Sequence, residues 1–131
     1  MTRSELEGLT IAVVDDDEAV RSAIDNLVRS LGLRAVVFAS AEAFLASGSS
    51  GTAACLITDV QMPGMSGVEL QNHLAVKGSQ MPVILITAFP REEVRAQVEA
   101  RGAAGYLSKP FEPQVLVECL DKALGLEGTL R

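Results

Sequence analysis

Acidic, hydroxyl and amine side chains stand at several points of this sequence, each directly after a short apolar run. In chain order they are Asp15, Asp16 and Asp17, then Asp59, Thr87 and Lys109. Carboxylates from separate segments repel one another unless a cation lies between them, and Mg²⁺ prefers such hard oxygen ligands while keeping some of its water. A lysine ammonium and a threonine hydroxyl directed at the same point would bind phosphoryl oxygens. The residue types therefore predict Mg²⁺-dependent phosphoryl transfer to an aspartate.

These side chains can meet only if the apolar runs are neighbouring strands of one parallel sheet. Strands are expected at residues 10–14, 34–38, 53–58, 82–87 and 104–107, and helices at 18–31, 40–47, 67–77, 91–101 and 112–124. This alternation is typical of consecutive βαβ units, so the predicted fold class is α/β. Ligands of an open parallel sheet bind beyond the carboxyl ends of its strands. The polar segments are therefore expected at one edge of the sheet.

Several helix boundaries are marked by residues with a clear local preference. Gly32 and Gly102 follow two helices as C-caps, and Ser40 precedes another as its N-cap. Pro90 is expected to open the helix at 91–101. Asp17, which the proposed chemistry does not require, is expected to cap the helix at 18–31.

Length, charge and cysteine content exclude several classes of function. The 131 residues, 48% of them hydrophobic, fit one domain, and a formal charge of -6 disfavours direct binding to nucleic acid. The acidic N-terminus does not resemble a signal peptide and no apolar run approaches membrane-spanning length, so a cytoplasmic location without membrane contact is expected. Cys55 and Cys119 lie in apolar contexts and are expected to be reduced, buried thiols. Residues 126–131 lose periodicity and are expected to form a tail or the stub of a linker.

From about residue 9 to residue 124 the sequence resembles the receiver domain of bacterial two-component response regulators. The matching segments, in order and at the family's spacing, are 13–17 (VVDDD), 58–67 (TDVQMPGMSG), 86–88 (ITA) and 109–111 (KPF). The run after Thr58 most resembles receivers that precede a helix-turn-helix output domain. The resemblance implies a receiver domain over residues 1–125, built as a single doubly wound, flavodoxin-like (βα)5 domain whose five parallel strands lie in the order 2-1-3-4-5.

The resemblance also implies a role for each residue of the acidic group. Asp59 is the phosphoacceptor, and the donor is a sensor histidine kinase, a histidine phosphotransfer protein or a small phosphodonor. Asp16 and Asp59 bind the Mg²⁺ cofactor directly, Asp15 acts mainly through bound water, and Gln61 adds its backbone carbonyl.

Other residues are implied to bind the phosphoryl group and to pass the signal on. Thr87 and Lys109 bind its oxygens, and the peptide bond between Lys109 and Pro110 is expected to be cis, which would direct the ammonium inward. Tyr106 resembles the family's aromatic switch, which swings inward when the Thr87 hydroxyl moves toward the phosphoryl group.

Three positions beside the acceptor are expected to control access and the lifetime of the phosphoryl group. Ala88 is small enough for a donor to approach. The family's residues at the positions of Gln61 and Phe89 influence attack by water, and the aromatic ring of Phe89 is expected to shield the acyl phosphate and so to lengthen its lifetime.

A surface made by the helices at 91–101 and 112–124 with the strand at 104–107 is implied to form a phosphorylation-dependent homodimer. Its apolar residues are Val94, Val98, Leu107, Val115 and Cys119. Because an amphipathic helix packed on a sheet needs an apolar stripe in any case, most of them are expected to be core positions. The prediction is a monomer that dimerises weakly when phosphorylated.

Three other classes of function fit part of the pattern. A phosphatase with an aspartyl-phosphate intermediate shares the nucleophile, Mg²⁺, Thr and Lys, but it expects a second Asp where this chain has Gln61. A flavodoxin-type FMN carrier would not place three aspartates beside the flavin phosphate. A receiver-like binding module that works without phosphorylation usually lacks one acidic or lysine position, and none is missing here. The prediction is a signalling phosphoacceptor rather than an enzyme.

Overall fold

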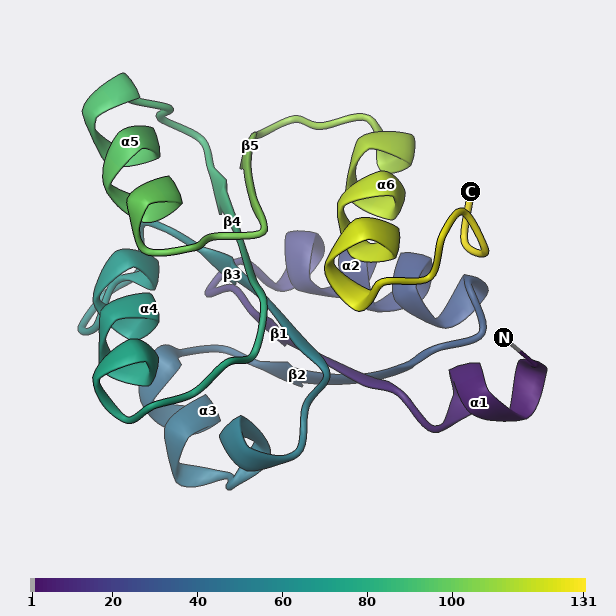
Figure 1. The fold of residues 1–131 in the computed structure, drawn as a ribbon. Coiled ribbons are helices and arrows are strands. Elements are labelled where there is room, and N and C mark those ends of the chain that lie inside the picture. Colours follow the sequence, from purple (N-terminus) through teal and green to yellow (C-terminus); the bar gives the residue numbers. More distant parts are fainter. Residues whose placement is uncertain (1) are drawn as a thin grey trace.

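Five parallel strands form the centre of the structure, a computed structural model that describes residues 2–131 (Figure 1). The strands are β1 (Thr10–Val14), β2 (Arg34–Phe38), β3 (Cys55–Asp59), β4 (Val83–Thr87) and β5 (Gly105–Ser108). They lie in the order β2-β1-β3-β4-β5, which confirms the predicted α/β class and strand order. The order reverses between β1 and β3, so the carboxyl ends of these two strands lie on either side of the crevice where ligands of such sheets bind.

The central strands are buried because helices pack on both faces of the sheet, while the edge strands β2 and β5 are partly exposed. Every residue of β3 and β4 is buried, as is every residue of β1 except Thr10. Their side chains are β-branched or aliphatic almost throughout, as strands buried on both faces require.

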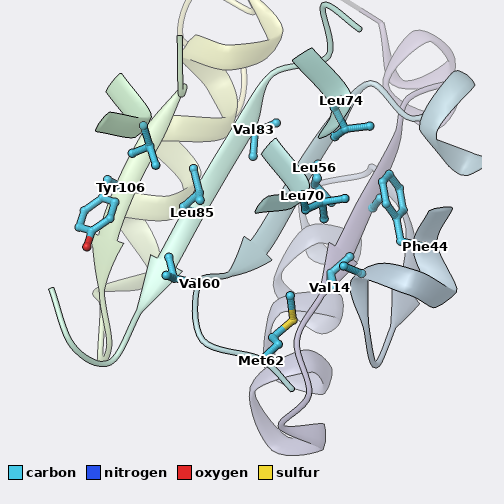
Figure 2. Packing of buried hydrophobic residues seen from close by; sticks show 13 residues of the cluster. Val14, Phe44, Leu56, Val60, Met62, Leu70, Leu74, Val83, Leu85 and Tyr106 are labelled. Atoms are coloured by element: carbon cyan, nitrogen blue, oxygen red, sulfur yellow. The ribbon is translucent and has the colours of Figure 1, made fainter. Parts of the chain in front are cut away.

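Helices pack on the two faces in separate groups. The helices are α1 (Arg3–Glu7), α2 (Glu18–Ser30), α3 (Ala41–Ala46), α4 (Gly67–Val76), α5 (Glu92–Ala100) and α6 (Pro113–Leu124), with a short 3-10 helix, η1 (Ser49–Gly51). On one face α2 and α6 contribute Ile24, Val28, Leu116 and Leu120 to one buried cluster. On the other face α3, α4 and α5 contribute Phe44, Leu70, Leu74 and Val98 to a second cluster (Figure 2).

The helix boundaries confirm most of the predicted punctuation and correct one part of it. Ser40 and Asp17 are N-caps, and the Asp17 carboxylate accepts hydrogen bonds from two backbone N–H groups of α2. Gly32 and Gly102 follow the C-caps of α2 and α5 with positive φ angles. The prediction that Pro90 opens α5 was wrong, because Arg91 is the N-cap and the helix begins one residue later.

Two short elements were not predicted. Helix α1 is fixed by a capping box in which Thr2 and Glu5 each accept a backbone N–H from the other residue. Its Leu6 packs against the cluster beneath α2 and α6. The other element, η1, lies in the connection between α3 and β3, and β3 begins at Cys55 rather than at residue 53.

The segment after α6 folds back onto that helix. The buried carboxylate of Asp121 accepts hydrogen bonds of 2.8 Å from the backbone N–H groups of Gly128 and Leu130. Leu126 is buried, and Leu130 packs against the cluster beneath α2 and α6. Residues 126–131 are therefore in contact with the domain. No helix among residues 2–131 is long and apolar enough to cross a membrane.

Candidate functional site

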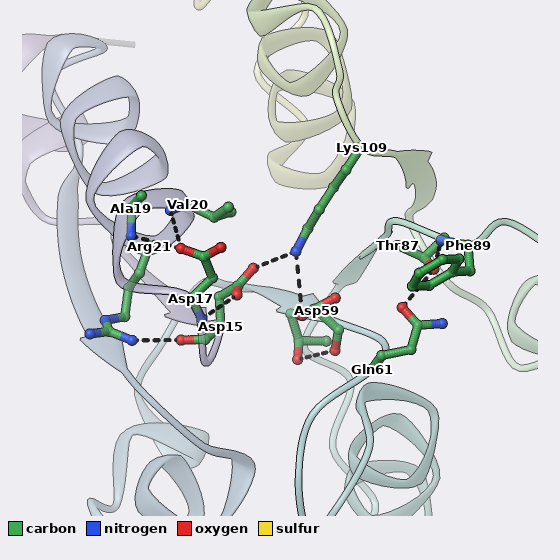
Figure 3. A network of polar contacts seen from close by, with 11 residues as sticks. Asp15, Asp17, Ala19, Val20, Arg21, Asp59, Gln61, Thr87, Phe89 and Lys109 are labelled. Atoms are coloured by element: carbon green, nitrogen blue, oxygen red, sulfur yellow. Dashed lines mark hydrogen bonds and ion pairs between the residues drawn. The ribbon is translucent and has the colours of Figure 1, made fainter.

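The polar residues singled out in the sequence gather at the carboxyl ends of the strands (Figure 3). Asp15 directly follows β1, Asp59 ends β3, Thr87 ends β4 and Lys109 directly follows β5. Each of Asp15, Asp16 and Asp59 offers a carboxylate oxygen, and these three oxygens all lie within 4.8 Å of one another. The predicted convergence of the acidic residues from two strand ends is thus present in the structure.

Lys109 lies between two of these carboxylates. Its Nζ is 3.0 Å from Oδ2 of Asp15 and 3.3 Å from Oδ2 of Asp59. Burial opposes the charge of the ammonium, but the hydrogen bond to Asp15 and the charges of Asp15 and Asp59 outweigh it and raise the pKa of Lys109. The side chain therefore stays charged and partly neutralises the acidic group. The peptide bond from Lys109 to Pro110 is cis, as expected.

Asp15 is the most constrained acid of the group. Its side chain is buried, its Oδ1 accepts the backbone N–H of Asp17 at 2.9 Å, and its Oδ2 accepts from Lys109. Arg21, on α2, donates from Nη1 to the backbone oxygen of Asp15 at 2.7 Å. Arg21 was not predicted from the sequence, although an arginine in the first turns of the helix after an acidic strand end is a signal that could have revealed it.

Asp59 carries an unfavourable charge in the absence of a cation. Burial of its carboxylate and the charge of Asp15 raise its pKa, against the lowering effect of Lys109, and Asp16 adds to the rise. Three carboxylates facing one ammonium leave a net negative site of hard oxygen ligands, and this chemistry fits Mg²⁺.

Thr87 and Gln61 are joined by a hydrogen bond. The Thr87 hydroxyl donates to Oε1 of Gln61 at 2.8 Å and accepts the backbone N–H of Phe89 at 3.0 Å. From the sequence, Gln61 was expected to act only through its backbone carbonyl and by influencing the attack of water on the acyl phosphate. The hydrogen bond to Thr87 was not predicted. Phe89 lies beside Thr87 with 70% of its surface exposed, and the neighbouring Ala88 is exposed as well.

The loop after Asp59 is held by a residue far away in sequence. Oε2 of Glu42, on α3, accepts the backbone N–H of Met65 at 2.9 Å. Gly64 has a φ angle of +76°, and a Cβ at that position would lie 2.6 Å from the same carboxylate oxygen. A Cβ at Gly67 would collide with the backbone carbonyl of Asp59. Both glycines therefore allow a close approach that fixes the loop beside the acceptor.

Tyr106 is turned inward, with only 5% of its surface exposed. Its hydroxyl accepts the backbone N–H of Arg91 at 3.2 Å, and the Arg95 guanidinium lies 4.8 Å from the ring centre, which is cation–π geometry. In this structure Tyr106 is inward while the Thr87 hydroxyl is directed to Gln61. The backbone N–H of Arg91 and the Arg95 guanidinium both contact Tyr106 in this inward position, and its coupling to the Thr87 hydroxyl stays a prediction.

The apolar residues of the surface expected to dimerise are less completely buried than predicted, although Val94, Leu107 and Cys119 pack against the two core clusters. Of its five apolar residues, Val98 is buried, Val115 is 40% exposed, and the others are half-buried: Val94, Leu107 and Cys119. Both cysteines are free thiols, as predicted, and burial raises the pKa of Cys55 to about 12. Cys119, predicted to be buried, is only half-buried.

Comparisons with known proteins agree with this arrangement. The family model described as the response regulator receiver domain matches residues 11–121. The transcriptional regulatory protein FixJ of Azorhizobium caulinodans is 38% identical over 91% of this chain and 56% of its own length. The response regulator protein TmoT of Ectopseudomonas mendocina is 41% identical over 88% of this chain and 53% of its own. The chain thus spans about half the length of these curated relatives.

Solved structures give the same result. The structure of the response regulator StyR matches with a TM-score of 0.84 and 38% identity, over 91% of this chain and 60% of that one. The structure titled FixJ-N matches with a TM-score of 0.79 and 34% identity, over 89% of this chain and 94% of that one.

The raised pKa of Asp59 predicts that its charge destabilises the chain in Mg²⁺-free buffer. Asp59→Asn should raise the free energy of unfolding at pH 7 by about 1 kcal/mol, the size of a typical single-site effect. Because the folded-state pKa is raised, the cost of the charge is absent below the unfolded pKa, about 3.9. It develops as the pH rises through the folded value. Denaturant unfolding from pH 3 to pH 8 measures this difference.

Glu118→Gln, which neutralises an exposed carboxylate on α6, is the matched control and should change stability little at any pH. Mg²⁺ should stabilise the natural chain more than Asp59→Asn, since binding to the folded state adds to its stability. An Asp59→Asn variant less stable than the natural chain at pH 7 without Mg²⁺ would contradict the prediction.

Proposed function

This chain belongs to the family of response regulator receiver domains, and we propose that Asp59 is the residue that accepts the phosphoryl group. Receiver domains of response regulators are signalling proteins that histidine kinases phosphorylate, and they are not enzymes in the usual sense. The observation that carries the proposal is the group of carboxylate oxygens within 4.8 Å of one another, with the Lys109 ammonium 3.3 Å from Asp59.

Asp59 is the best nucleophile of the acidic group. Both carboxylate oxygens of Asp15 are already bonded, one to the backbone of Asp17 and one to Lys109. Asp59, in contrast, has Lys109 as the only side-chain partner of its carboxylate among residues 2–131, through Oδ2. An oxygen of this carboxylate is therefore free to attack phosphorus, while Asp16, which is exposed, faces solvent.

Mg²⁺ is proposed to bind directly to Asp16 and Asp59, to the backbone carbonyl of Gln61, and to Asp15 through water. The bonded state of both Asp15 oxygens supports its indirect role. Bound Mg²⁺ would neutralise charge on the phosphoryl oxygens. The chain's own residues would bind the cation and position the attacking carboxylate.

The transfer needs no other nucleophile. An Asp59 carboxylate oxygen forms a bond to phosphorus as the bond from phosphorus to the donor's imidazole nitrogen, or to the oxygen of a small phosphodonor, breaks. The electron pair leaves with the donor, and water later cleaves the acyl phosphate. Lys109 and Thr87 are proposed to bind the phosphoryl oxygens, and the exposed, small Ala88 leaves room for the donor.

We propose a sensor histidine kinase or a histidine phosphotransfer protein as the partner, and a cytoplasmic location in keeping with the family. The net charge of -6 supports an output that does not involve direct binding of nucleic acid by this domain. FixJ is described as a transcriptional regulatory protein and TmoT as a response regulator protein. This chain covers about half the length of each. Control of transcription through a further domain or partner is proposed on that similarity.

The phosphoacceptor is tested by incubating the chain with Mg²⁺ and acetyl phosphate and measuring its intact mass. The natural chain should gain the mass of one phosphoryl group, and chelation of Mg²⁺ should prevent the gain. Asp59→Asn should gain nothing, whereas Asp25→Asn, which changes an aspartate of α2 paired with Arg29, should behave like the natural chain. An unmodified natural chain would favour a receiver-like module that works without phosphorylation, and equal gain in Asp59→Asn would exclude Asp59.

Phe89 is proposed to shield the acyl phosphate from water. Residue Phe89 is 70% exposed, and its backbone N–H is bonded to the hydroxyl of Thr87, which ends β4 at the same edge of the sheet as Asp59. Phe89→Glu should shorten the phosphoryl lifetime several-fold, because a carboxylate positions water and a phenyl ring does not. Loss of the added mass with time measures this, with Phe89→Leu as an apolar control. Equal lifetimes in Phe89→Glu and the natural chain would contradict the shielding role.

Weak dimerisation through α5, β5 and α6 is proposed for the phosphorylated chain only. The half-buried state of most apolar residues there supports a small contact rather than a permanent one. Sedimentation velocity with Mg²⁺ and beryllofluoride, a phosphoryl mimic, should detect a faster species that is absent without the mimic and absent in Asp59→Asn. Sedimentation that the mimic leaves unchanged at high protein concentration would refute the proposal.

A further inference from the structure

The single hydroxyl proton of Thr87 is committed to Gln61. Thr87 is fully buried, its Oγ1 accepts the backbone N–H of Phe89 at 3.0 Å, and it donates to Oε1 of Gln61 at 2.8 Å. A hydroxyl has one proton to donate. A phosphoryl oxygen and the Gln61 amide therefore compete for it.

The Gln61 amide and a phosphoryl group on Asp59 would both lie close to the Thr87 hydroxyl. Thr87 ends β4, and Asp59, which ends β3, is paired in the sheet with Ile86, one residue before Thr87. Gln61 is two residues beyond Asp59, on the loop that Glu42 holds through Met65. The phosphoacceptor at the end of β3 and the Gln61 amide that accepts the Thr87 proton are thus only two residues apart in the chain.

We propose that Gln61 is a positioning residue whose side-chain amide holds the Thr87 hydroxyl in the unphosphorylated chain. This inference rests on the proposed function, because it gives the hydroxyl a second acceptor on phosphorylated Asp59. Phosphorylation must then break the bond between Thr87 and Gln61 before the hydroxyl can reach the phosphoryl oxygens. Gln61 acts through Thr87 and contacts no reacting atom in this role.

The exposure of the two residues sets the size of the effect. Gln61 is exposed, so water replaces the lost hydrogen bond at its amide when Thr87 leaves, whereas Thr87 itself stays buried. A neutral hydrogen bond of this kind has a modest net value, which corresponds to about a fivefold change in an equilibrium constant. Gln61 therefore restrains the active state without preventing it.

The test compares the affinity of the natural chain for beryllofluoride with that of the Gln61→Met variant, both in the presence of Mg²⁺. Methionine keeps the length of the side chain and removes the acceptor, and this mimic is an equilibrium ligand whose binding does not depend on the rate of dephosphorylation. Gln61→Met should bind about fivefold more tightly. Gln114→Met, an exposed glutamine in the first turn of α6, should bind like the natural chain.

A double-mutant cycle separates this role from a general structural one. In a Thr87→Val background the hydroxyl is absent, so Gln61→Met should leave the affinity for beryllofluoride unchanged. Equal affinity of natural chain and Gln61→Met would overturn the inference, as would the same gain in the Thr87→Val background.

A second measurement tests the restraint without any phosphoryl mimic. Three-bond couplings measured by NMR should show one χ1 rotamer of Thr87 in the natural chain and averaging in Gln61→Met. An unchanged rotamer in Gln61→Met would overturn the inference. A natural chain that binds no beryllofluoride and gains no mass from acetyl phosphate would refute the proposed function instead, so the two failures are distinguishable.

Discussion

Repulsion between carboxylates at one edge of the sheet is the constraint on which the rest of the site depends. The parallel strands β1 and β3 bring Asp15 and Asp59 together, and Asp16 adds a third oxygen ligand within 4.8 Å. Lys109 offsets part of this charge from the end of β5. Because one ammonium cannot neutralise three carboxylates, the arrangement favours a bound cation and leaves Asp59 with a raised pKa. The same charge that costs stability thus makes the site suitable for Mg²⁺ and a phosphoryl group.

The fold could be predicted from the sequence because its strongest signals are local. The strands Thr10–Val14 and Arg34–Phe38 have the predicted bounds, because a short run of apolar, mostly β-branched residues marks where each strand begins and ends. The errors are at weak or short signals. The helix Arg3–Glu7 depends on a capping box in a five-residue element, and the helix after β4, which Pro90 was predicted to open, begins at Glu92 with Arg91 as its N-cap. Such boundaries are set by backbone hydrogen bonds that the pattern of apolar residues does not encode.

The acidic and basic residues of the site could be predicted because each stands at a strand end, and topology alone brings such ends together. The hydrogen bonds that fix the loop and the Thr87 hydroxyl could not be predicted. Glu42 reaches Met65 across 23 residues, and Thr87 reaches Gln61 across 26, so both depend on how separate elements pack. Their consequences are specific. Glu42 fixes the loop beside the acceptor, and Gln61 occupies the hydroxyl that the phosphoryl group is proposed to use.

The role of Asp59 as phosphoacceptor is tested most directly by locating the modified residue chemically. Borohydride reduces an aspartyl phosphate to homoserine, so the chain treated with acetyl phosphate and Mg²⁺ can be reduced, digested and mapped by peptide mass. Homoserine is expected at position 59, with unmodified aspartate at Asp15 and Asp16. Homoserine at either of those two positions, or a phosphoryl group retained on another type of residue, would contradict the assignment of Asp59 as the phosphoacceptor.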